Sequence, residues 1–267
     1  MTLRAEHIGN GVTQLAMSTW RGRLVGYTVS AYVLRGVLID SGFARVEREL
    51  LAAMGELVPR GAVITHRHED HSGNAAALAT LRMPLLMHPE CDAALRSVPP
   101  IRLYRSLVWG TATRLASTTE SFDPAPLEII ETPGHTSDHV VVWDAERSIV
   151  ASGDLFLGVK VRVAHEHERP RQLVSSLKRV LALEPKTLLD AHRGPLDNAS
   201  ALLRAKIDWM EETIGEIETL AGKGAGEREI QRLLLGREDF VGYVSRGEYS
   251  KLGLVRAVLR EEDRKTG

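Results

Sequence analysis

The chain has 267 residues, of which 43% are hydrophobic and 26% are charged, and its formal net charge is -1. This length fits one large domain or one domain with an appendage, and the composition is typical of a globular protein. A net charge near zero gives no overall attraction to nucleic acid or anionic membranes, and no apolar run approaches the roughly 20 residues that span a bilayer. The single cysteine, Cys91, excludes an internal disulfide, and residues 1–7 lack an apolar secretory core. We therefore expect a cytoplasmic protein.

The first hundred residues predict strands and helices in alternation. Runs rich in Val, Leu and Tyr predict strands over residues 24–34, 37–39, 62–64 and 84–87. Apolar residues at helical spacing, or runs of alanine, predict helices over residues 45–57, 73–81 and 90–96. Strands and helices in this order predict an α/β layered fold.

Residues 99–122 interrupt this alternation, and we expect a helical insertion there. Its apolar and aromatic residues include Leu103, Tyr104, Leu107 and Trp109. A surface subdomain and a lid or substrate wall over the site are equally compatible with this pattern, since insertions between ligand loops often lie at the site. Tyr104 is accordingly a candidate substrate contact.

Strand signals resume after the insertion and are followed by helices. The predicted strands cover residues 127–130, 139–143, 148–151 and 187–189, and the predicted helices cover residues 171–183, 198–220, 229–235 and 249–260. We therefore predict a catalytic domain over residues 1–197 and a helical extension over residues 198–267. Apolar residues of the long helix, such as Ile207 and Met210, fit either a core or a homodimer interface.

Residues 65–71, with the sequence T-H-R-H-E-D-H, place three histidines and an aspartate directly after an apolar run. Imidazole and carboxylate are the usual ligands of zinc and its first-row neighbours. His66 and His68 alternate, so in an extended segment both rings point the same way and can hold one ion. Asp70 and His71 follow where the chain can turn, and can offer ligands to a second ion. A solvated histidine-rich loop is the alternative, and we disfavour it because the rest of the chain supplies further ligands.

Three more candidate ligands lie far along the chain: His135 in T-P-G-H-T, Asp154 in S-G-D and His192 in D-A-H-R-G. Each follows an apolar run or lies in a turn flanked by glycine, where α/β folds place their chemistry. The order H-x-H-x-D-H, GH, GD and H resembles the metallo-β-lactamase-fold hydrolase superfamily from about residue 24 to about residue 195. The resemblance implies an α/β fold, namely a four-layer αββα sandwich with a helical C-terminal extension.

All seven ligand positions of that superfamily are filled in this chain. By resemblance, the first metal ion would be held by His66, His68 and His135. The second would be held by Asp70, His71 and His192, with Asp154 bridging both ions. We therefore expect two divalent metal ions per chain, with zinc favoured, although manganese and iron suit the same ligands.

Such a site generates a nucleophile, because a water bound between two cations loses its proton near neutral pH and can attack a carbonyl or phosphoryl centre. Asp70 could accept a proton after the attack, so Asp70 and Asp154 are the candidate catalytic carboxylates. Metal-binding histidines need outer partners that fix their ring tautomers. By resemblance, Asp40 and His139 occupy positions of that kind; a turn-forming aspartate and a packing histidine are the alternatives.

Other polar residues near the ligand segments are candidate substrate contacts. Lys160 and Arg162 alternate with valines, so both would project to one side and could bind an anionic group. His165 and His167 follow in A-H-E-H-E and could reach a substrate or hold extra metal. A solvated loop is the favoured interpretation of these two histidines.

The resemblance favours hydrolysis of a thioester, lactone or other ester of a small molecule. A glyoxalase II-like thioesterase is the first choice, but residues 155–159 lack that family's Cys-Gly-Arg segment, which argues against glutathione recognition. A phosphodiesterase or endoribonuclease of the same fold is the alternative: residues 226–234 resemble the start of its helical wing domain, but the chain shows no basic stripe. A thiol dioxygenase, a β-lactamase and a non-enzymatic binding module are less favoured. We therefore expect a small molecule and no membrane as the partner, with nucleic acid as the disfavoured alternative.

Overall fold

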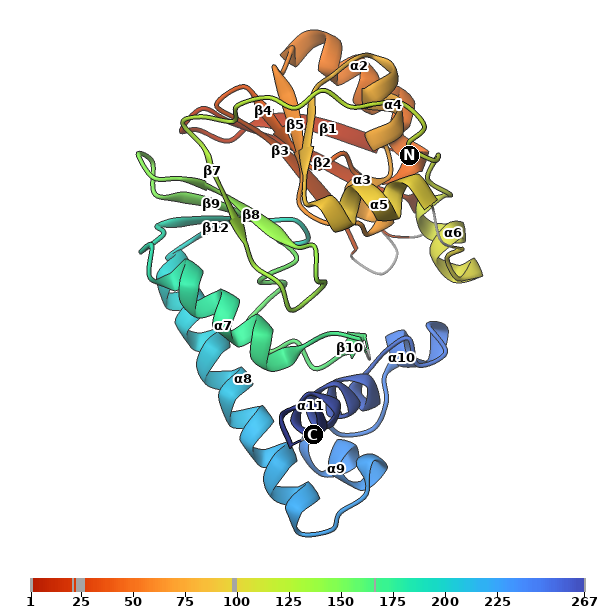
Figure 1. Ribbon diagram of the computed structural model, residues 1–267, viewed down its shortest axis with the longest axis vertical. Coiled ribbons are helices and arrows are strands. Elements are labelled where there is room, and N and C mark those ends of the chain that lie inside the picture. Colours follow the sequence, from red (N-terminus) through yellow and green to blue (C-terminus); the bar gives the residue numbers. More distant parts are fainter. Residues whose placement is uncertain (1, 21, 23–26, 98–99, 166, 267) are drawn as a thin grey trace. The chain divides into compact units, whose positions relative to one another are not determined.

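The computed structural model describes residues 2–20, 22, 27–97, 100–165 and 167–266. Two large sheets and a set of helices give the mixed α/β class that the sequence predicts (Figure 1). The chain forms two compact units. The first comprises Met1–Glu131, Asp138–Asp154 and Pro185–Ala199; the second comprises Thr132–Ser137, Leu155–Glu184 and Ser200–Gly267. The predicted domain boundary after residue 197 stays a prediction.

The first sheet of the first unit has six strands in sequential order. They are β1 (Thr2–His7), β2 (Val12–Ser18), β3 (Val29–Leu34), β4 (Val37–Ile39), β5 (Gly61–Ile64) and β6 (Leu85–Met87). β1 to β4 pair antiparallel, whereas β4, β5 and β6 pair parallel. The sequence did not predict β1 and β2: nearly all of β1 is exposed, so it carries no apolar pattern. The predicted strand over 24–34 begins at Val29, and its residues 24–26 lie outside the described residues.

Alternate residues of the central strands face two different cores. In β3, Ala31 and Val33 pack with the helices of this unit, whereas Tyr32 and Leu34 pack toward the second sheet. Because both faces are buried, the strand is apolar at every position except Ser30. Figure 1 shows the covering helices in orange and yellow. They are α2 (Glu47–Leu57) with the preceding 3-10 turn η1 (Ala44–Val46), α4 (Ala75–Thr80) and α5 (Pro89–Ser97).

The second sheet of the first unit has five strands in the order β12-β11-β9-β8-β7. Their bounds are β7 (Glu128–Glu131), β8 (Val140–Asp144), β9 (Ile149–Gly153), β11 (Thr187–Asp190) and β12 (Gly194–Asp197). β9 and β11 pair parallel, and the other pairs are antiparallel. Val142 and Leu189 share one core with Tyr32 and Val63 of the first sheet, so the two sheets bury their facing sides against each other.

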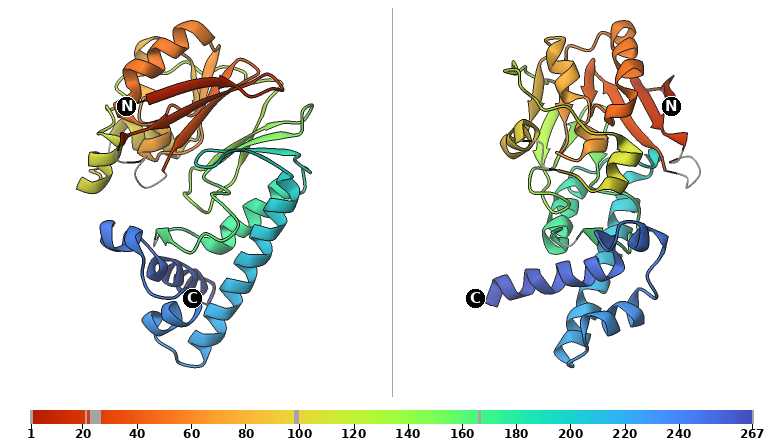
Figure 2. Two further views of the ribbon diagram at one scale, coloured as in Figure 1. Left: turned by 180° about the vertical axis from the view of Figure 1, so that it is seen from behind. Right: turned by 90° about the vertical axis from the view of Figure 1, so that its right-hand side faces the viewer.

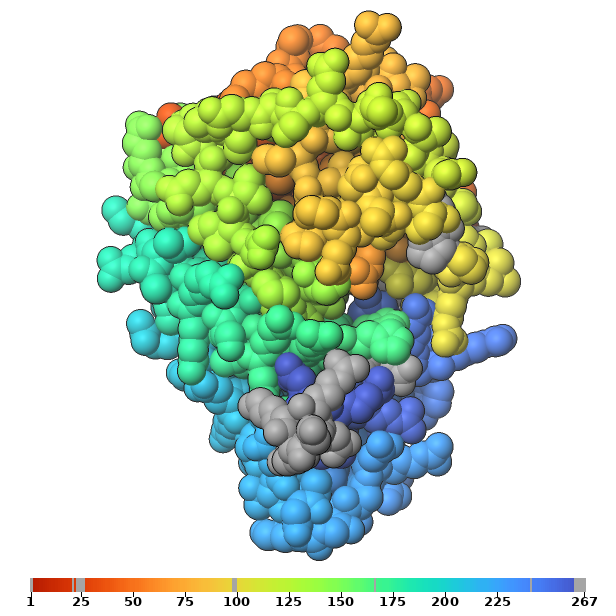
Figure 3. Space-filling view, in the orientation of Figure 1, coloured from red at the N-terminus to blue at the C-terminus, as the bar shows by residue number. Residues whose placement is uncertain are grey.

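The predicted helical insertion over 99–122 is wrong for most of its length. Among the residues of this range that the structure describes, only α6 (Leu103–Trp109) is helical, and residues 110–127 form neither helix nor strand. Gly110, at φ 86°, ends the helix, and the following run is rich in threonine and serine, which favour helices poorly. This segment is attached to the first sheet, because Leu85 N–H donates to the carbonyl of Glu120 at 2.9 Å. Figure 3 shows it in yellow-green along the surface of the first unit.

The second unit is mostly helical (Figure 2). Its elements are β10 (Ala164–His165), α7 (Pro170–Leu181), α8 (Ala199–Gly222), α9 (Glu227–Leu234), α10 (Phe240–Val244), β13 (Tyr249–Ser250) and α11 (Lys251–Thr266). α11 contacts both α7 and α9, and Arg171 of α7 donates to the carbonyl of Val258 at 3.0 Å. In the described part of the chain, no helix is long and apolar enough to cross a membrane.

Candidate metal centre

Most of the predicted metal ligands lie where strands of the two sheets end. His66 follows β5, Asp154 follows β9, and His192 follows β11. β5 runs parallel to β4, and β9 runs parallel to β11, so strand ends of each sheet meet at one edge. Loops at the carboxyl ends of parallel strands are where α/β folds place their polar chemistry. The chain therefore brings together residues that are more than a hundred positions apart in sequence.

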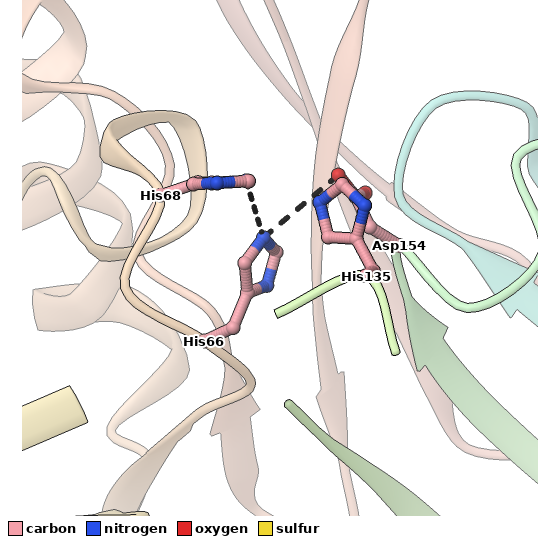
Figure 4. Close-up of side chains that lie close together, drawn as sticks. All are labelled: His66, His68, His135 and Asp154. Carbon is pink, nitrogen blue, oxygen red and sulfur yellow. Dashed lines mark hydrogen bonds and ion pairs between the residues drawn. The ribbon is translucent and has the colours of Figure 1, made fainter. Parts of the chain in front are cut away.

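The seven predicted ligands form two groups in the structure. His66, His68, His135 and Asp154 make up the first group, and Asp70, His71 and His192 make up the second. Within each group the ligand atoms all lie within 4.8 Å of one another, and Figure 4 shows the first group. Histidine nitrogens and carboxylate oxygens at such spacing suit zinc or another first-row ion. His135 itself lies in Thr132–Ser137, a segment that groups with the second unit, where its Nδ1 is 3.6 Å from Glu168.

The geometry around Asp154 fits metal ligation better than ordinary hydrogen bonding. Its Oδ1 is 3.1 Å from the Nε2 atom of His71 and 3.1 Å from that of His192. Yet both nitrogens are buried without a hydrogen-bond partner among the described residues. Buried polar atoms are nearly always satisfied, so two such nitrogens converging on one carboxylate are suited to sharing a cation with it. The residues present therefore fit a bound divalent cation.

The other ring nitrogen of each of these histidines has a protein acceptor. His71 Nδ1 lies 2.8 Å from Asp40 Oδ2, and His192 Nδ1 lies 3.0 Å from the carbonyl of Thr28. Such partners hold Nδ1 protonated and leave Nε2 as the nitrogen that can bind an ion. The structure thus places Asp40 where the sequence analysis expects an outer partner.

Electrostatics at the site depend strongly on burial. Burial, with the neighbouring His71 and His68, lowers the pKa of His66 well below its ordinary value. Burial also opposes the charged form of His192, but the carboxylates of Asp154 and Asp70 outweigh it and raise the pKa of His192 to about 9. Burial thus favours the neutral ring at His66, whereas two neighbouring carboxylates favour the charged ring at His192.

His139 supports Asp154 rather than joining the ligand set. Asp154 N–H donates to His139 Nε2 at 3.1 Å, and His139 is buried. Gly153 between them has φ 48°, and a Cβ there would lie 2.8 Å from His139 Nε2. The close approach therefore requires glycine before Asp154.

Two supporting carboxylates were not singled out from the sequence. Asp190 accepts hydrogen bonds from the backbone N–H groups of His192 and Arg193, both at 2.8 Å. Asp138 is fully buried and accepts from the backbone N–H of Arg67 at 2.8 Å. The only local signal for either residue was an aspartate next to a ligand loop, which is equally typical of a turn.

The predicted substrate contacts lie on segments other than the ligand loops. Tyr104 is half-buried on α6, and Lys160 and Arg162 are exposed. His165 Nε2 is 3.7 Å from Glu248, and its ring lies 5.6 Å from that of Tyr249, both within the second unit. The substrate roles of these residues stay predictions.

Comparison with known proteins defines the class of protein. Residues 24–192 match the family described as the Metallo-beta-lactamase superfamily, and this chain belongs to that superfamily. A crystal structure of a metallo-beta-lactamase family protein from Thermus thermophilus superposes with a TM-score of 0.68 at 18% identity, covering 96% of this chain and 95% of that one. The solved structures thus share the fold.

Among curated proteins, the chain is 25% identical to a beta-lactamase-like protein 2 homolog of Caenorhabditis elegans, over 81% of this chain and 72% of the relative. It is 26% identical to a hydroxyacylglutathione hydrolase of Aeromonas hydrophila, over 78% of this chain and 80% of the relative. Together, the family and the His/Asp cluster support a metal-dependent hydrolase.

Proposed function

We propose that this protein hydrolyses a thioester, a lactone or another ester of a small molecule, using two divalent metal ions. The observation that carries the proposal is the position of Asp154. Its Oδ1 faces His71 and His192 at 3.1 Å, while its Oδ2 is 3.8 Å from His66 Nε2. A carboxylate that presents one oxygen to each ligand group is suited to bridging two cations.

The candidate ligands would each bind one of the two ions or both, and one carboxylate would also accept a proton. His66, His68 and His135 would hold one ion, and Asp70, His71 and His192 the other. Bound ions would supply Lewis acidity and a water of lowered pKa. Asp70 is 5% exposed, and we propose its carboxylate as the acceptor of a proton released in the site.

The ester or thioester class is supported by the named activity of several relatives. One hydroxyacylglutathione hydrolase, from a Methylobacterium, is 31% identical over 155 residues, or 55% of this chain. Residues 155–159 of this chain, L-F-L-G-V, lack a Cys-Gly-Arg segment. The proposed substrate is therefore an acyl compound that does not depend on glutathione for binding. Zinc as the metal, a small molecule as the partner and a cytoplasmic location are parts of the same proposal.

Elemental analysis of the purified protein, combined with a substrate panel, tests this proposal. We expect about two zinc, manganese or iron ions per chain, and activity on one thioester, lactone or ester but not on a β-lactam. Asp154→Asn should lose most of the activity and part of the metal, whereas Asp92→Asn, in a half-buried pair with Arg96, should change neither. A metal-free wild type, or a preference for a phosphodiester, would overturn it.

A further inference from the structure

Two ion pairs hold the loop that carries His66, His68 and Asp70. The loop supplies the cation in one pair and the anion in the other. Arg67 donates from its guanidinium to Asp138 Oδ1 at 3.0 Å and from its backbone to Oδ2 at 2.8 Å. Glu69 pairs with Arg105, whose Nη2 donates to Oε2 at 2.7 Å and whose Nε donates to Oε1. The two charged residues that alternate with the ligands are therefore both fixed by partners elsewhere in the chain.

The Glu69–Arg105 pair is the more unusual of the two. Glu69 is 7% exposed, and it begins the four-residue helix α3 (Glu69–Ser72), which contains Asp70 and His71. A buried carboxylate is costly unless it is paired, and a two-point contact with a guanidinium also fixes its orientation. Arg105 lies on α6, in the segment that interrupts the alternation of strands and helices. The ligand turn is thus completed by a residue from the insertion.

The same face of α6 also reaches the other segment of the second ligand group. Trp109 lies four residues, about one helical turn, after Arg105 and therefore on the same face. Its ring is 5.1 Å from the ring of Tyr27, which in turn is 4.9 Å from the ring of His192. Trp109 is itself buried, with its ring 5.0 Å from that of Phe43. α6 is therefore connected to both segments that supply Asp70, His71 and His192.

We propose that Arg105 is a positioning residue for the second ligand group, and that α6 is part of the metal centre rather than a separate surface subdomain. Through Glu69, Arg105 holds the turn in which Asp70 and His71 present their ligand atoms. The inference rests on the metal-binding part of the proposed function, and it does not depend on which substrate is cleaved.

Zinc affinity measured by competition with a chromophoric chelator tests the inference. Arg105→Met removes the charge and both donors, and we expect one of the two ions to bind about 10- to 100-fold more weakly, while the other is unaffected. Arg96→Met is the matched control, because Arg96 makes a similar two-point contact with Asp92, at 2.8 and 2.9 Å, and Asp92 is not one of the candidate ligands. It should leave both zinc affinities unchanged.

A purely structural role for Arg105 predicts a different result. In that case Arg105→Met would have a lower melting temperature, but its zinc affinity when folded would equal that of Arg96→Met. This result would overturn the inference. If Arg105→Met does not fold, Arg105→Lys decides, since lysine keeps the charge but not the planar two-point contact. Weaker binding of one ion supports the inference, and wild-type affinity overturns it. A wild type that binds no ion would instead overturn the proposed function as well.

Discussion

Asp40 links three parts of the metal centre through its two carboxylate oxygens. Oδ1 accepts from the backbone N–H of Thr65 at 2.7 Å, and Oδ2 accepts from the Thr65 hydroxyl at 2.9 Å and faces His71 Nδ1 at 2.8 Å. Asp40 has φ 63°, in the left-handed region that aspartate tolerates better than most residues. The end of β4 is thereby joined to the end of β5 and to a candidate ligand.

Asp40→Asn should weaken metal binding more than it weakens the fold. The amide offers one acceptor oxygen instead of two, so it cannot serve both Thr65 and the His71 ring. We expect zinc affinity to fall about 10- to 100-fold, as is typical when an outer partner of a metal-binding histidine is lost. Chelator competition measures this change, and an unaltered affinity would contradict the role of Asp40.

At the scale of elements, an ion pair between the half-buried Arg35 and the buried Asp144 connects the turn after β3 with the end of β8. Arg35 Nε donates to Asp144 Oδ2 at 2.7 Å and its Nη2 donates to Oδ1 at 3.2 Å, while Asp144 also accepts from the backbone of Arg147. Burial by itself would raise the pKa of Asp144, but these hydrogen bonds outweigh it, and the pKa lies below the ordinary 3.8. The pair therefore joins the two sheets of the first unit.

Asp144→Asn should destabilise the protein by about 1–3 kcal/mol at neutral pH, the usual worth of hydrogen bonds to a charged group. Because the folded-state pKa is depressed, this stabilisation is fully present above the unfolded-state pKa and is lost as the pH falls through the folded-state value. Urea denaturation at pH 7 and again below about pH 3, under the depressed pKa of Asp144, should thus show a smaller difference between variant and wild type in acid. An equal difference at both pH values would be inconsistent with the pair.

Arg60, directly before β5, holds the end of the segment formed by residues 110–127. The Arg60 guanidinium donates to the carbonyls of Asp123, Pro124 and Ala125 at 2.5, 2.8 and 2.7 Å. The ring of Phe122 also packs so closely over Gly61 that a Cβ there would lie 2.6 Å from it. A segment without helix or strand pairing is thus fixed by side-chain contacts.

Arg60→Ala should release this segment without unfolding the sheet. Removing three charge-assisted hydrogen bonds favours local opening, and the opened segment is a substrate for proteases. We expect cleavage between residues 110 and 127 to become several-fold faster than in wild type under limited proteolysis, as read by mass spectrometry. Cleavage at the wild-type rate would show that Arg60 does not hold the segment.

At the scale of the whole molecule, folding brings the carboxylates and imidazoles of the candidate ligands together from distant parts of the sequence. Ions that bind only the folded form stabilise it by mass action, by about 2.7 kcal/mol when free zinc is 100-fold above its dissociation constant. The melting temperature should therefore rise on zinc addition and fall on chelation, and the shift should be smaller for Asp154→Asn. Identical melting curves with and without zinc would contradict the metal site.

The sequence by itself determined the fold class and the candidate ligands. The motif H-x-H-x-D-H and the turns around His135, Asp154 and His192 are local patterns, and such patterns can be recognised in a single sequence. The fully buried strands β3 and β5 were predictable for the same reason, because they are apolar at almost every position. The exposed edge strand β1 and the non-helical run after Trp109 carry no such pattern, since their conformation depends on partners distant in sequence.

Only the tertiary structure decided how these residues support one another. Asp190 and Asp138 look like ordinary loop aspartates in sequence, and their roles appear when the backbone of His192 and the guanidinium of Arg67 are seen to contact them. The connection of α6 to the ligand turn depends likewise on a contact between residues 36 positions apart. Ligand identity is a property of residue chemistry, whereas orientation is a property of packing, and packing is fixed only when the whole chain has folded.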